Sequence, residues 1–347
     1  MIRASTLAVS AGLFVCSAAA ALAQTPSVTV GAGVQTSYIH TDTDNASSTD
    51  QLPLNSVRLY VSGTAAPKIT YMFNTEYDGA GNHVDVLDAA AQVSLSPQVN
   101  FWAGRMLPPS DRANLYGPYY ANEWAVYTDG VQDGYPFVFQ GRDNGFLYWG
   151  QFDKVKVSGG VFDGKTATGN PTVLSAGRVQ VDFWDKEDGY YLNGTYYGKK
   201  NLLALGVAGQ VQGTSNTAWS ADFLLEKKVL GGGAFTIESE YADYNQLGGY
   251  NARYMRDQGG YGLASLLFPP AMGLTGNFEI MGKFAGAKFT KGLTAVDQDY
   301  RQKTTEINFD YVIKDFNARV MLFFKNTDYN AVLPNNRQFG VGLQLQI

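Results

Sequence analysis

The residues with the strongest chemical character are concentrated in one long stretch, residues 107–142. Charges of both signs on an aromatic-rich loop suit the lining of a path for hydrated solutes, because their sign decides which ions pass. A loop of this length without periodicity is usually either functional or disordered, and disordered segments lack aromatics. We therefore expect an ordered loop that packs against surrounding walls. Its charged residues are Asp111, Arg112, Glu123, Asp129, Asp133 and Arg142, with eight aromatic residues among them.

The walls are predicted to carry charges on alternate positions of strand-like runs. This alternation points basic residues inward at Arg58, Arg105, Lys156, Arg178, Arg319 and Lys325, with Arg105 at the entry to the loop. It points acidic residues inward at Glu76, Asp182, Asp222, Glu226, Glu238, Glu240, Glu306 and Asp310. Because acidic side chains are in excess, the lining favours neutral or cationic solutes over a dianion such as phosphate. If the charges pair across strands instead, the path is unselective.

Catalytic chemistry is poorly supported by the sequence. The only histidines are His40 and His83, each near a strand-to-loop junction, with Asp85 and Asp88 close to His83. A hydrolase or a metal site would need further ligands or a positioned nucleophile. We therefore expect solvated loop histidines, no catalytic residues, no metal and no cofactor.

Periodicity identifies the elements that position these charges. In residues 306–313, for example, apolar Ile307 and Phe309 alternate with polar Asn308, and the last ten residues alternate in the same way. A soluble sandwich would show the same alternation, with its polar face in water. Many runs, however, reach the roughly 9–11 residues that cross a bilayer. Short turns also alternate with long loops, and no helical run occurs, so the prediction is an all-β, transmembrane antiparallel β-barrel.

The number of strands follows from the same runs. We predict sixteen strands, with eighteen as the alternative, and the long loop 107–142 folded into the lumen. A seventeenth run, at 190–197, is interrupted by Asn193 and Gly194, and we assign it to a connection because bacterial barrels have even strand numbers. Its tyrosines, Tyr190, Tyr191, Tyr196 and Tyr197, are interpreted as an interfacial aromatic girdle.

The N-terminus and the composition indicate an exported protein. Residues 1–23 have a basic Arg3, an apolar core and a small-x-small ending, which predicts a signal peptide and a barrel domain over 24–347. Removing them leaves 25 basic and 31 acidic residues, a net charge of −6 that argues against a nucleic-acid partner. Cys16 is the only cysteine, so the mature chain has no disulfides or thiolate chemistry. The expected location is the outer membrane of a Gram-negative bacterium.

One region resembles a known family. Residues 103–109, 141–150 and 155–164 and the run Ala176-Gly177-Arg178 resemble the strands around the third loop of the phosphate-selective porin O and P family, most strongly over 99–184. The resemblance implies a sixteen-stranded, trimeric porin whose third loop forms the constriction. The sequence departs from the family in its C-terminal Ile347, where an aromatic is usual, and in lacking an evident basic ladder for phosphate.

These observations predict an outer-membrane porin, not an enzyme. Its partners would be outer-membrane lipid, small hydrophilic solutes or ions diffusing through a water-filled channel, and further copies of itself in a homotrimer. Alternatives are an anion- or phosphate-selective porin, a surface barrel with an adhesive or structural role, and a sheath for an electron-transfer partner. The last would need redox groups from another protein, because the chain has no haem-attachment motif.

Overall fold

The computed structural model describes residues 26–78, 83–124, 141–165, 171–213, 216–247, 253–270, 273, 275–294, 297–330 and 332–347. The predicted signal peptide lies outside these residues. Within them the chain forms a single 17-stranded antiparallel sheet. The described residues also include two short helical elements, α1 (Arg112–Tyr116) and η1 (Pro118–Tyr120). No helix in the described ranges is long and apolar enough to span a membrane.

Sixteen of the strands are long and the remaining one, β2 (Thr49–Gln51), is a three-residue addition beside β1. The long strands are β1 (Ser27–Thr43), β3 (Leu54–Ala66), β4 (Ile69–Asp78), β5 (His83–Ser96), β6 (Val99–Met106), β7 (Asp143–Phe152), β8 (Val155–Lys165), β9 (Pro171–Asp182), β10 (Leu202–Gln212), β11 (Asn216–Val229), β12 (Gly233–Asn245), β13 (Tyr254–Leu267), β14 (Asn277–Gly292), β15 (Tyr300–Lys314), β16 (Ala318–Asp328) and β17 (Asn336–Gln346). The predicted count of sixteen is confirmed for the described chain, and residues 190–197 do not form a strand.

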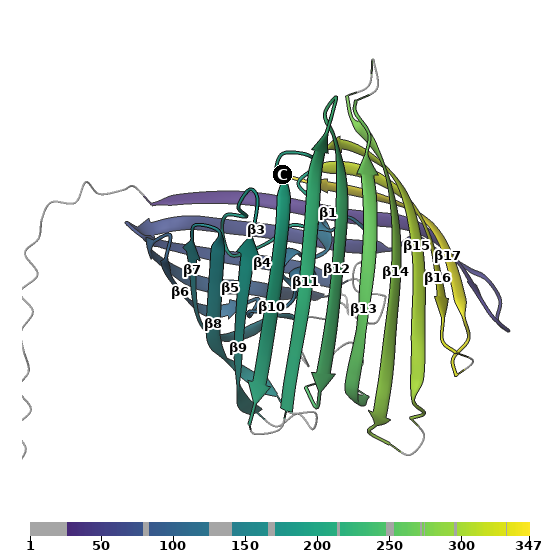
Figure 1. Ribbon diagram of the computed structural model, residues 1–347, viewed down its shortest axis with the longest axis horizontal. Coiled ribbons are helices and arrows are strands. Elements are labelled where there is room, and N and C mark those ends of the chain that lie inside the picture. Colours follow the sequence, from purple (N-terminus) through teal and green to yellow (C-terminus); the bar gives the residue numbers. More distant parts are fainter. Residues whose placement is uncertain are drawn as a thin grey trace, which may run out of the picture.

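The sheet closes on itself because β1 pairs with both β17 and β3. The β1–β17 register runs from Gly33 opposite Gln346 to Thr43 opposite Asn336. Every other long strand pairs with its sequence neighbours. Closure removes the sheet edges, whose unpaired N–H and C=O groups lipid could not satisfy. In Figure 1, β10–β15 lie on one side of the barrel, and β1 and β3 cross behind them.

Alternation along each strand separates an apolar outer face from a polar inner face. In β15, Ile307 and Phe309 are 42% and 55% exposed, whereas Asn308 between them is fully buried. Large apolar side chains are exposed in this way around the barrel, from Val28 on β1 to Leu345 on β17. An outward apolar band around a polar interior is the pattern of a barrel in lipid.

The two ends of the barrel differ in their connections. Tight turns join β3 to β4, β7 to β8 and β15 to β16, and use positive φ angles at Lys68, Asp153 and Asp315 (66°, 55° and 45°). Ile347 lies at the same end, where its N–H donates to the Ala32 carbonyl oxygen at 2.9 Å. Two connections at this end are longer: residues 183–201, between β9 and β10, and residues 268–276, between β13 and β14. The loop 107–142 leaves from the other end.

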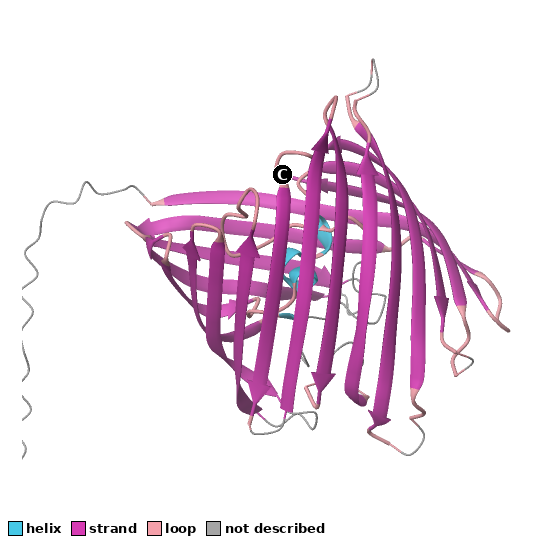
Figure 2. Cartoon of the chain, in the orientation of Figure 1, coloured by secondary structure: helices cyan, strands magenta, loops and turns pink. Residues whose placement is uncertain are grey.

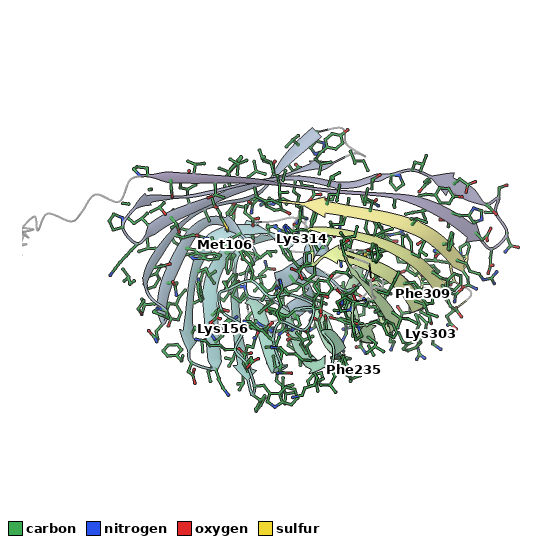
Figure 3. The ribbon with its side chains drawn as sticks, turned by 90° about the horizontal axis from the view of Figure 1, so that it is seen from above. Met106, Lys156, Phe235, Lys303, Phe309 and Lys314 are labelled. Carbon is green, nitrogen blue, oxygen red and sulfur yellow. The ribbon has the colours of Figure 1, made fainter. Side chains whose placement is uncertain are left out.

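The interior of the barrel is occupied. Figure 2 shows the two short helical elements within the ring of strands, and Figure 3, viewed from above, shows side chains crowding the enclosed space. A continuous buried cluster includes Leu107 and Leu115 of the long loop, Trp102 of β6, and Tyr190 and Leu192 of the 183–201 connection. The described part of the loop 107–142 thus folds into the lumen, as predicted.

Candidate functional site

The long loop enters the lumen through a short capped helix. Asp111 is the N-cap of α1, and its side chain accepts a hydrogen bond from the Asn114 N–H at 2.7 Å. Gly117, with φ of 67°, ends the helix and lets the chain turn into η1. Burial raises the pKa of Asp111 to about 6, although the Asn114 N–H opposes this increase. Asp111 therefore acts first as a structural cap.

Beyond the helix, the loop crosses to the opposite side of the barrel. Glu123 accepts a hydrogen bond from Lys283 Nζ on β14 at 2.7 Å. The carbonyl oxygen of Ala121 accepts one from Arg319 on β16, also at 2.7 Å. Trp124 stacks on Phe323 of β16, with ring centroids 6.2 Å apart. These contacts fasten the described part of the loop to the wall opposite β6.

Glycines on the wall make room for the aromatics of the loop. A Cβ atom at Gly33 on β1 would lie 2.7 Å from the Tyr119 ring. A Cβ at Gly342 on β17 would lie 2.6 Å from the Trp124 ring. Real Cβ atoms do not approach other atoms so closely, so any larger residue here would displace the loop. The backbone of β1 and β17 is therefore matched to the folded-in loop.

A second segment meets the loop from the tight-turn end of the barrel. This inner segment, residues 183–201, places Glu187 against Arg112, with N–O distances of 2.5 and 2.9 Å, and both side chains are fully buried. Arg112 also donates to the Asn193 carbonyl oxygen at 3.0 Å. Backbone hydrogen bonds join Leu192 to Leu115 and Gly194 to Tyr120. Two segments from opposite ends are thus joined in the middle of the lumen.

The ion pair between these segments stays charged over a wide pH range. Burial by itself would raise the pKa of Glu187. The positive charge of Arg112 and its hydrogen bonds outweigh burial and lower the pKa to about 2. The hydroxyl of Tyr196, which donates to Glu187 at 2.8 Å, acts in the same direction.

The interpretation of the tyrosines in this segment as an interfacial girdle is wrong. Tyr190 is buried and donates to the Leu107 carbonyl oxygen at 2.9 Å. Tyr197 is buried beside Arg319, with its hydroxyl 3.3 Å from the guanidinium. Tyr191 packs on Trp102 with ring centroids 5.7 Å apart. The tyrosines point inward because the connection folds back into the barrel, and the alternation that suggested an outer band is not that of a strand.

Two facing regions of the lumen carry different charge patterns. The paired wall, formed by the inner faces of β3–β9, couples each of several carboxylates to a guanidinium. Arg58 donates to Glu76 at 2.5 Å, and Arg142 Nε lies 3.4 Å from Asp88. Arg178 makes a two-pronged ion pair with an aspartate across β10, Asp222 on β11.

The acidic wall, formed by the inner faces of β11–β15, holds carboxylates with few cations. Glu238 accepts hydrogen bonds from the hydroxyls of Tyr116 (2.9 Å) and Tyr261 (2.5 Å). Glu279 lies directly opposite Asp310 in the β14–β15 register. Like charges in this position repel each other. The acidic wall is therefore the more negative side of the lumen.

Most of the predicted lining residues lie buried on the inner face. They are Arg58, Glu76, Lys156, Arg178, Asp182, Asp222, Glu226, Glu238, Glu240, Glu306, Asp310, Arg319 and Lys325 on strands, with Asp111, Arg112, Glu123 and Arg142 on the loop. Asp129 and Asp133 lie outside the described residues.

The prediction that Arg105 points into the lumen at the entry to the loop is wrong. Arg105 shares a face of β6 with Phe101, which is 48% exposed, whereas Asn100 and Trp102 face inward and are buried. Its Nε donates to the Val86 carbonyl oxygen at 3.1 Å at the barrel surface. The direction of Arg105 could not be read from the sequence because β6 places the large aromatic Trp102 on the lumen side. This breaks the usual alternation of apolar residues facing out and polar residues facing in.

Sequence reasoning missed Glu187, the fully buried carboxylate that joins the inner segment to Arg112 of the loop. Its segment has neither strand nor helix periodicity and lies at the tight-turn end of the barrel. A usable signal was nevertheless present: residues 183–201 are long for that end and rich in charges and tyrosines, as the loop 107–142 is. Lys283 and Glu279, two inward-facing residues of β14, were also missed.

The comparisons with known proteins support the fold but do not assign the chain to a family. No protein-family model matches the sequence, and neither does any curated protein. Among solved structures, the chain is similar to an anion-selective porin from Comamonas acidovorans, with 13% identity and a TM-score of 0.59 over 93% of this chain and 100% of the other. It is also similar to OprB from Pseudomonas putida, with 8% identity and a TM-score of 0.61 over 93% and 94%.

A third similar structure is a trimer form of OmpT, an outer-membrane protein of Vibrio cholerae. It has 10% identity and a TM-score of 0.54 over 93% of this chain and 100% of the other. This chain has the fold of Gram-negative outer-membrane β-barrels. The apolar outer band agrees with that environment, and the location expected from the sequence is the one this fold occupies.

Proposed function

We propose that this protein is an outer-membrane porin through which small hydrophilic solutes and ions diffuse passively. The observation that carries the proposal is the closed sixteen-stranded barrel whose charged inner face is crossed by a loop from one end and an inner segment from the other. A polar, charged interior is not needed for a purely structural barrel and is costly to bury. It is useful where water and ions pass.

The narrowest part of the channel is formed, in this proposal, by the loop 107–142 together with residues 183–201. Three buried contacts support this assignment: Arg112 with Glu187, Glu123 with Lys283, and Ala121 with Arg319. They draw the loop across the lumen at the level where both walls carry their charges. The contact between the loop 107–142 and residues 183–201, centred on Arg112 and Glu187, is called the joint below. The space that remains beside this joint would limit the size of the solute.

The channel is proposed to be unselective or weakly cation-preferring. Among the buried charged side chains of the described chain, fifteen are acidic and eight are basic. Selectivity follows the sign of the charges that line a pore. The paired wall is close to neutral, so the excess negative charge is concentrated on the acidic wall. The resemblance to phosphate-selective porins over 99–184 stays a prediction that this charge balance does not favour.

Two further parts of the proposal concern the whole protein. Residues 1–23 would be removed as a signal peptide, leaving 24–347 as the barrel. The barrel would assemble as a homotrimer, for which the similarity to a trimeric barrel is the supporting observation.

Reconstitution into planar lipid bilayers tests the proposal. Purified protein should produce stepwise ionic currents in symmetric potassium chloride, and radiolabelled small sugars or amino acids should equilibrate across vesicles that contain it. Absence of both, from protein that is folded by circular dichroism and heat-modifiable on gels, would exclude the channel and favour a surface barrel with an adhesive or structural role.

A further inference from the structure

A cluster of basic residues lies on the outer face of the barrel, at the end from which the loop 107–142 leaves. Its members, called the outer basic patch, are Lys288 on β14 and Arg301 and Lys303 on β15, and all three are exposed. They alternate along their strands with Phe289 and Gln302, which face inward and are buried. Figure 3, in which Lys303 is labelled, shows this residue on the outside of the ring of strands. The outer basic patch therefore has no part in the lumen.

Two of these charges oppose each other. Lys288 lies directly opposite Arg301 in the β14–β15 register. Like charges in this position on neighbouring strands are destabilising, and an anion placed between them would remove the repulsion. The pair is a feature of the surface that the fold itself does not need.

The chain does not neutralise this patch. In the part of the chain that the structure describes, none of its three residues makes an ion pair, although Asp328 lies opposite Lys303 in the β15–β16 register. On the neighbouring β13, by contrast, Arg256 pairs with Asp243 of β12 at 2.7 Å. The positive charge that remains at this end of β14 and β15 is thus available to an anion from outside the chain.

The outer basic patch lies at the edge of the apolar outer band. On β15, Ile307 follows Lys303 by four residues and is 42% exposed. On β14, Phe284 precedes Lys288 by four residues and is 57% exposed. Four residues of a strand span about 13 Å, a distance that the long stems of lysine and arginine shorten. Positive charges therefore stand directly above side chains that contact lipid tails.

The outer surface around Phe284 is low. Gly282 and Gly286 face outward on β14, and Gly262 lies opposite Phe284 on β13. A Cβ atom added at any of these three glycines would meet no other atom within 4 Å. The surface below the patch therefore leaves room for acyl chains to lie against the sheet beside the Phe284 ring.

A lipid that carries phosphate groups above its acyl chains complements both parts of this surface. Outer-membrane barrels have their long loops at the extracellular end, so the patch faces the headgroups of the outer leaflet. Clusters of lysine and arginine beside a membrane attract anionic headgroups, and a guanidinium binds phosphate oxygens through two parallel N–H groups.

We propose that the outer basic patch binds the phosphorylated headgroup of a glycolipid of the outer leaflet. Lys288 and Arg301 share one phosphate, which removes their mutual repulsion, and Lys303 contacts the same headgroup from the side. The acyl chains run along Phe284 and Ile307. This inference goes beyond the proposed channel function and does not depend on it.

The test measures binding of diphosphoryl lipid A, the phosphorylated anchor of such a glycolipid, to the purified full-length protein in detergent. Native mass spectrometry during a titration gives the amount bound, and we expect saturable binding. A basic residue close to a phosphate-bearing surface contributes about fivefold in affinity, so the variant K288Q/R301Q/K303Q should bind about a hundredfold more weakly.

The matched control is K227Q/K228Q/K314Q. It removes the same number of positive charges from exposed lysines at the tight-turn end of the barrel. Its affinity for lipid A should equal that of the wild type. Circular dichroism and heat-modifiability on gels establish that both variants are folded.

Arg301→Gln by itself separates binding from a structural role. In the lipid-free protein it removes the repulsion from Lys288, so resistance to urea should be unchanged or slightly higher. Its affinity for lipid A should nevertheless fall about fivefold. Lower resistance to urea without lipid would show that Arg301 stabilises the barrel directly and would overturn the proposal.

Four further results would overturn it. The first is equal lipid A binding by the patch variant and the wild type, and the second is an equal loss in the control variant, which would indicate a general effect of net charge. The third is displacement of lipid A by inorganic phosphate, which would assign the patch to a free anion. The fourth is a lipid-free patch variant with an altered oligomeric state, which would assign this surface to a contact between copies of the chain.

Discussion

The paired wall of β3–β9 and the acidic wall of β11–β15 face the same lumen and satisfy their carboxylates in opposite ways. On the paired wall, Glu76 and Asp88 each meet a guanidinium. On the acidic wall, Glu238 meets two tyrosine hydroxyls, and Glu279 faces another carboxylate across the register. This contrast shows that burial alone does not decide the role of a charged side chain in the lumen. Paired charges organise structure, and unpaired ones set the potential that an ion experiences.

The joint between the loop and the inner segment separates the two walls. Arg112 reaches Glu187 on one side and lies 3.5 Å from Asp222 of β11 on the other. Ions attracted to the acidic wall would therefore pass this obstruction on its β11 side. The experiments below remove this obstruction or change one wall at a time.

Deleting residues 114–133 should have the largest effect. The strands keep their own ladders, so the barrel should still fold, while the lumen loses the material that fills it. Single-channel conductance in potassium chloride should rise to a multiple of the wild-type value, and the distinction between the walls should weaken. A folded deletion variant with unchanged conductance would contradict the assignment of the loop to the narrowest part.

Breaking the buried ion pair should come next. Arg112→Met leaves Glu187 buried without its cation, which typically costs about 3–5 kcal/mol. Urea denaturation of the variant in detergent should show this loss, and its conductance should become larger and noisier as the joint loosens. The double variant R112M/E187M is the control, because it removes both charges and should recover much of the stability. Equal losses in the single and double variants would argue against a direct interaction.

The same substitution on the two walls should have opposite effects on stability. Glu76→Gln weakens the pairing of Arg58 and should destabilise the barrel by about 1–3 kcal/mol. Glu279→Gln relieves repulsion from Asp310 and should stabilise it by about 0.2–1 kcal/mol. Glu279→Gln should also lower the cation preference more than Glu76→Gln does. The measurements are urea denaturation and the potassium-to-chloride permeability ratio, and changes of the same sign on both walls would refute the division.

Lowering the pH should have the smallest effect on the conductance over most of the range between pH 7 and pH 2. The pKa of Glu187 is lowered to about 2, below the usual value of 4.5 for a glutamate. A group with a lowered folded-state pKa stabilises the fold fully above its unfolded pKa and loses this contribution as the pH falls through the folded pKa. The joint should therefore hold from pH 7 to about 4.5 and loosen only toward pH 2. Conductance recorded at stepped pH checks this, and opening already at pH 5–6 would contradict it.

The fold was largely predictable from sequence because each strand repeats one simple constraint. Apolar residues such as Ile307 and Phe309 must face lipid on alternate positions, and this fixes both the strand and its phase. The predicted direction of Arg105 was wrong because this alternation is weak in β6, which places Trp102 inside and Phe101 outside.

The site was less predictable because its parts come together by tertiary folding without periodicity. The aromatic and charged loop was recognised, but nothing local indicates that Arg112 meets Glu187, 75 residues away. Likewise, the sequence suggested that the tyrosines of the inner segment form an outer aromatic band, and only the folded structure shows that they lie inside the barrel. Ion pairing between the two walls depends on which strands lie opposite each other in the barrel, and a single sequence does not contain this information.

Ions are expected to cross the lumen along the acidic wall, past the contact between the loop 107–142 and residues 183–201. The decisive measurement is the reversal potential of the wild-type channel in a tenfold potassium chloride gradient at low ionic strength, where screening is weakest. We expect conduction with a reversal potential at zero or displaced modestly toward the potassium equilibrium potential. A clear displacement toward the chloride potential, with current blocked by phosphate, would contradict it.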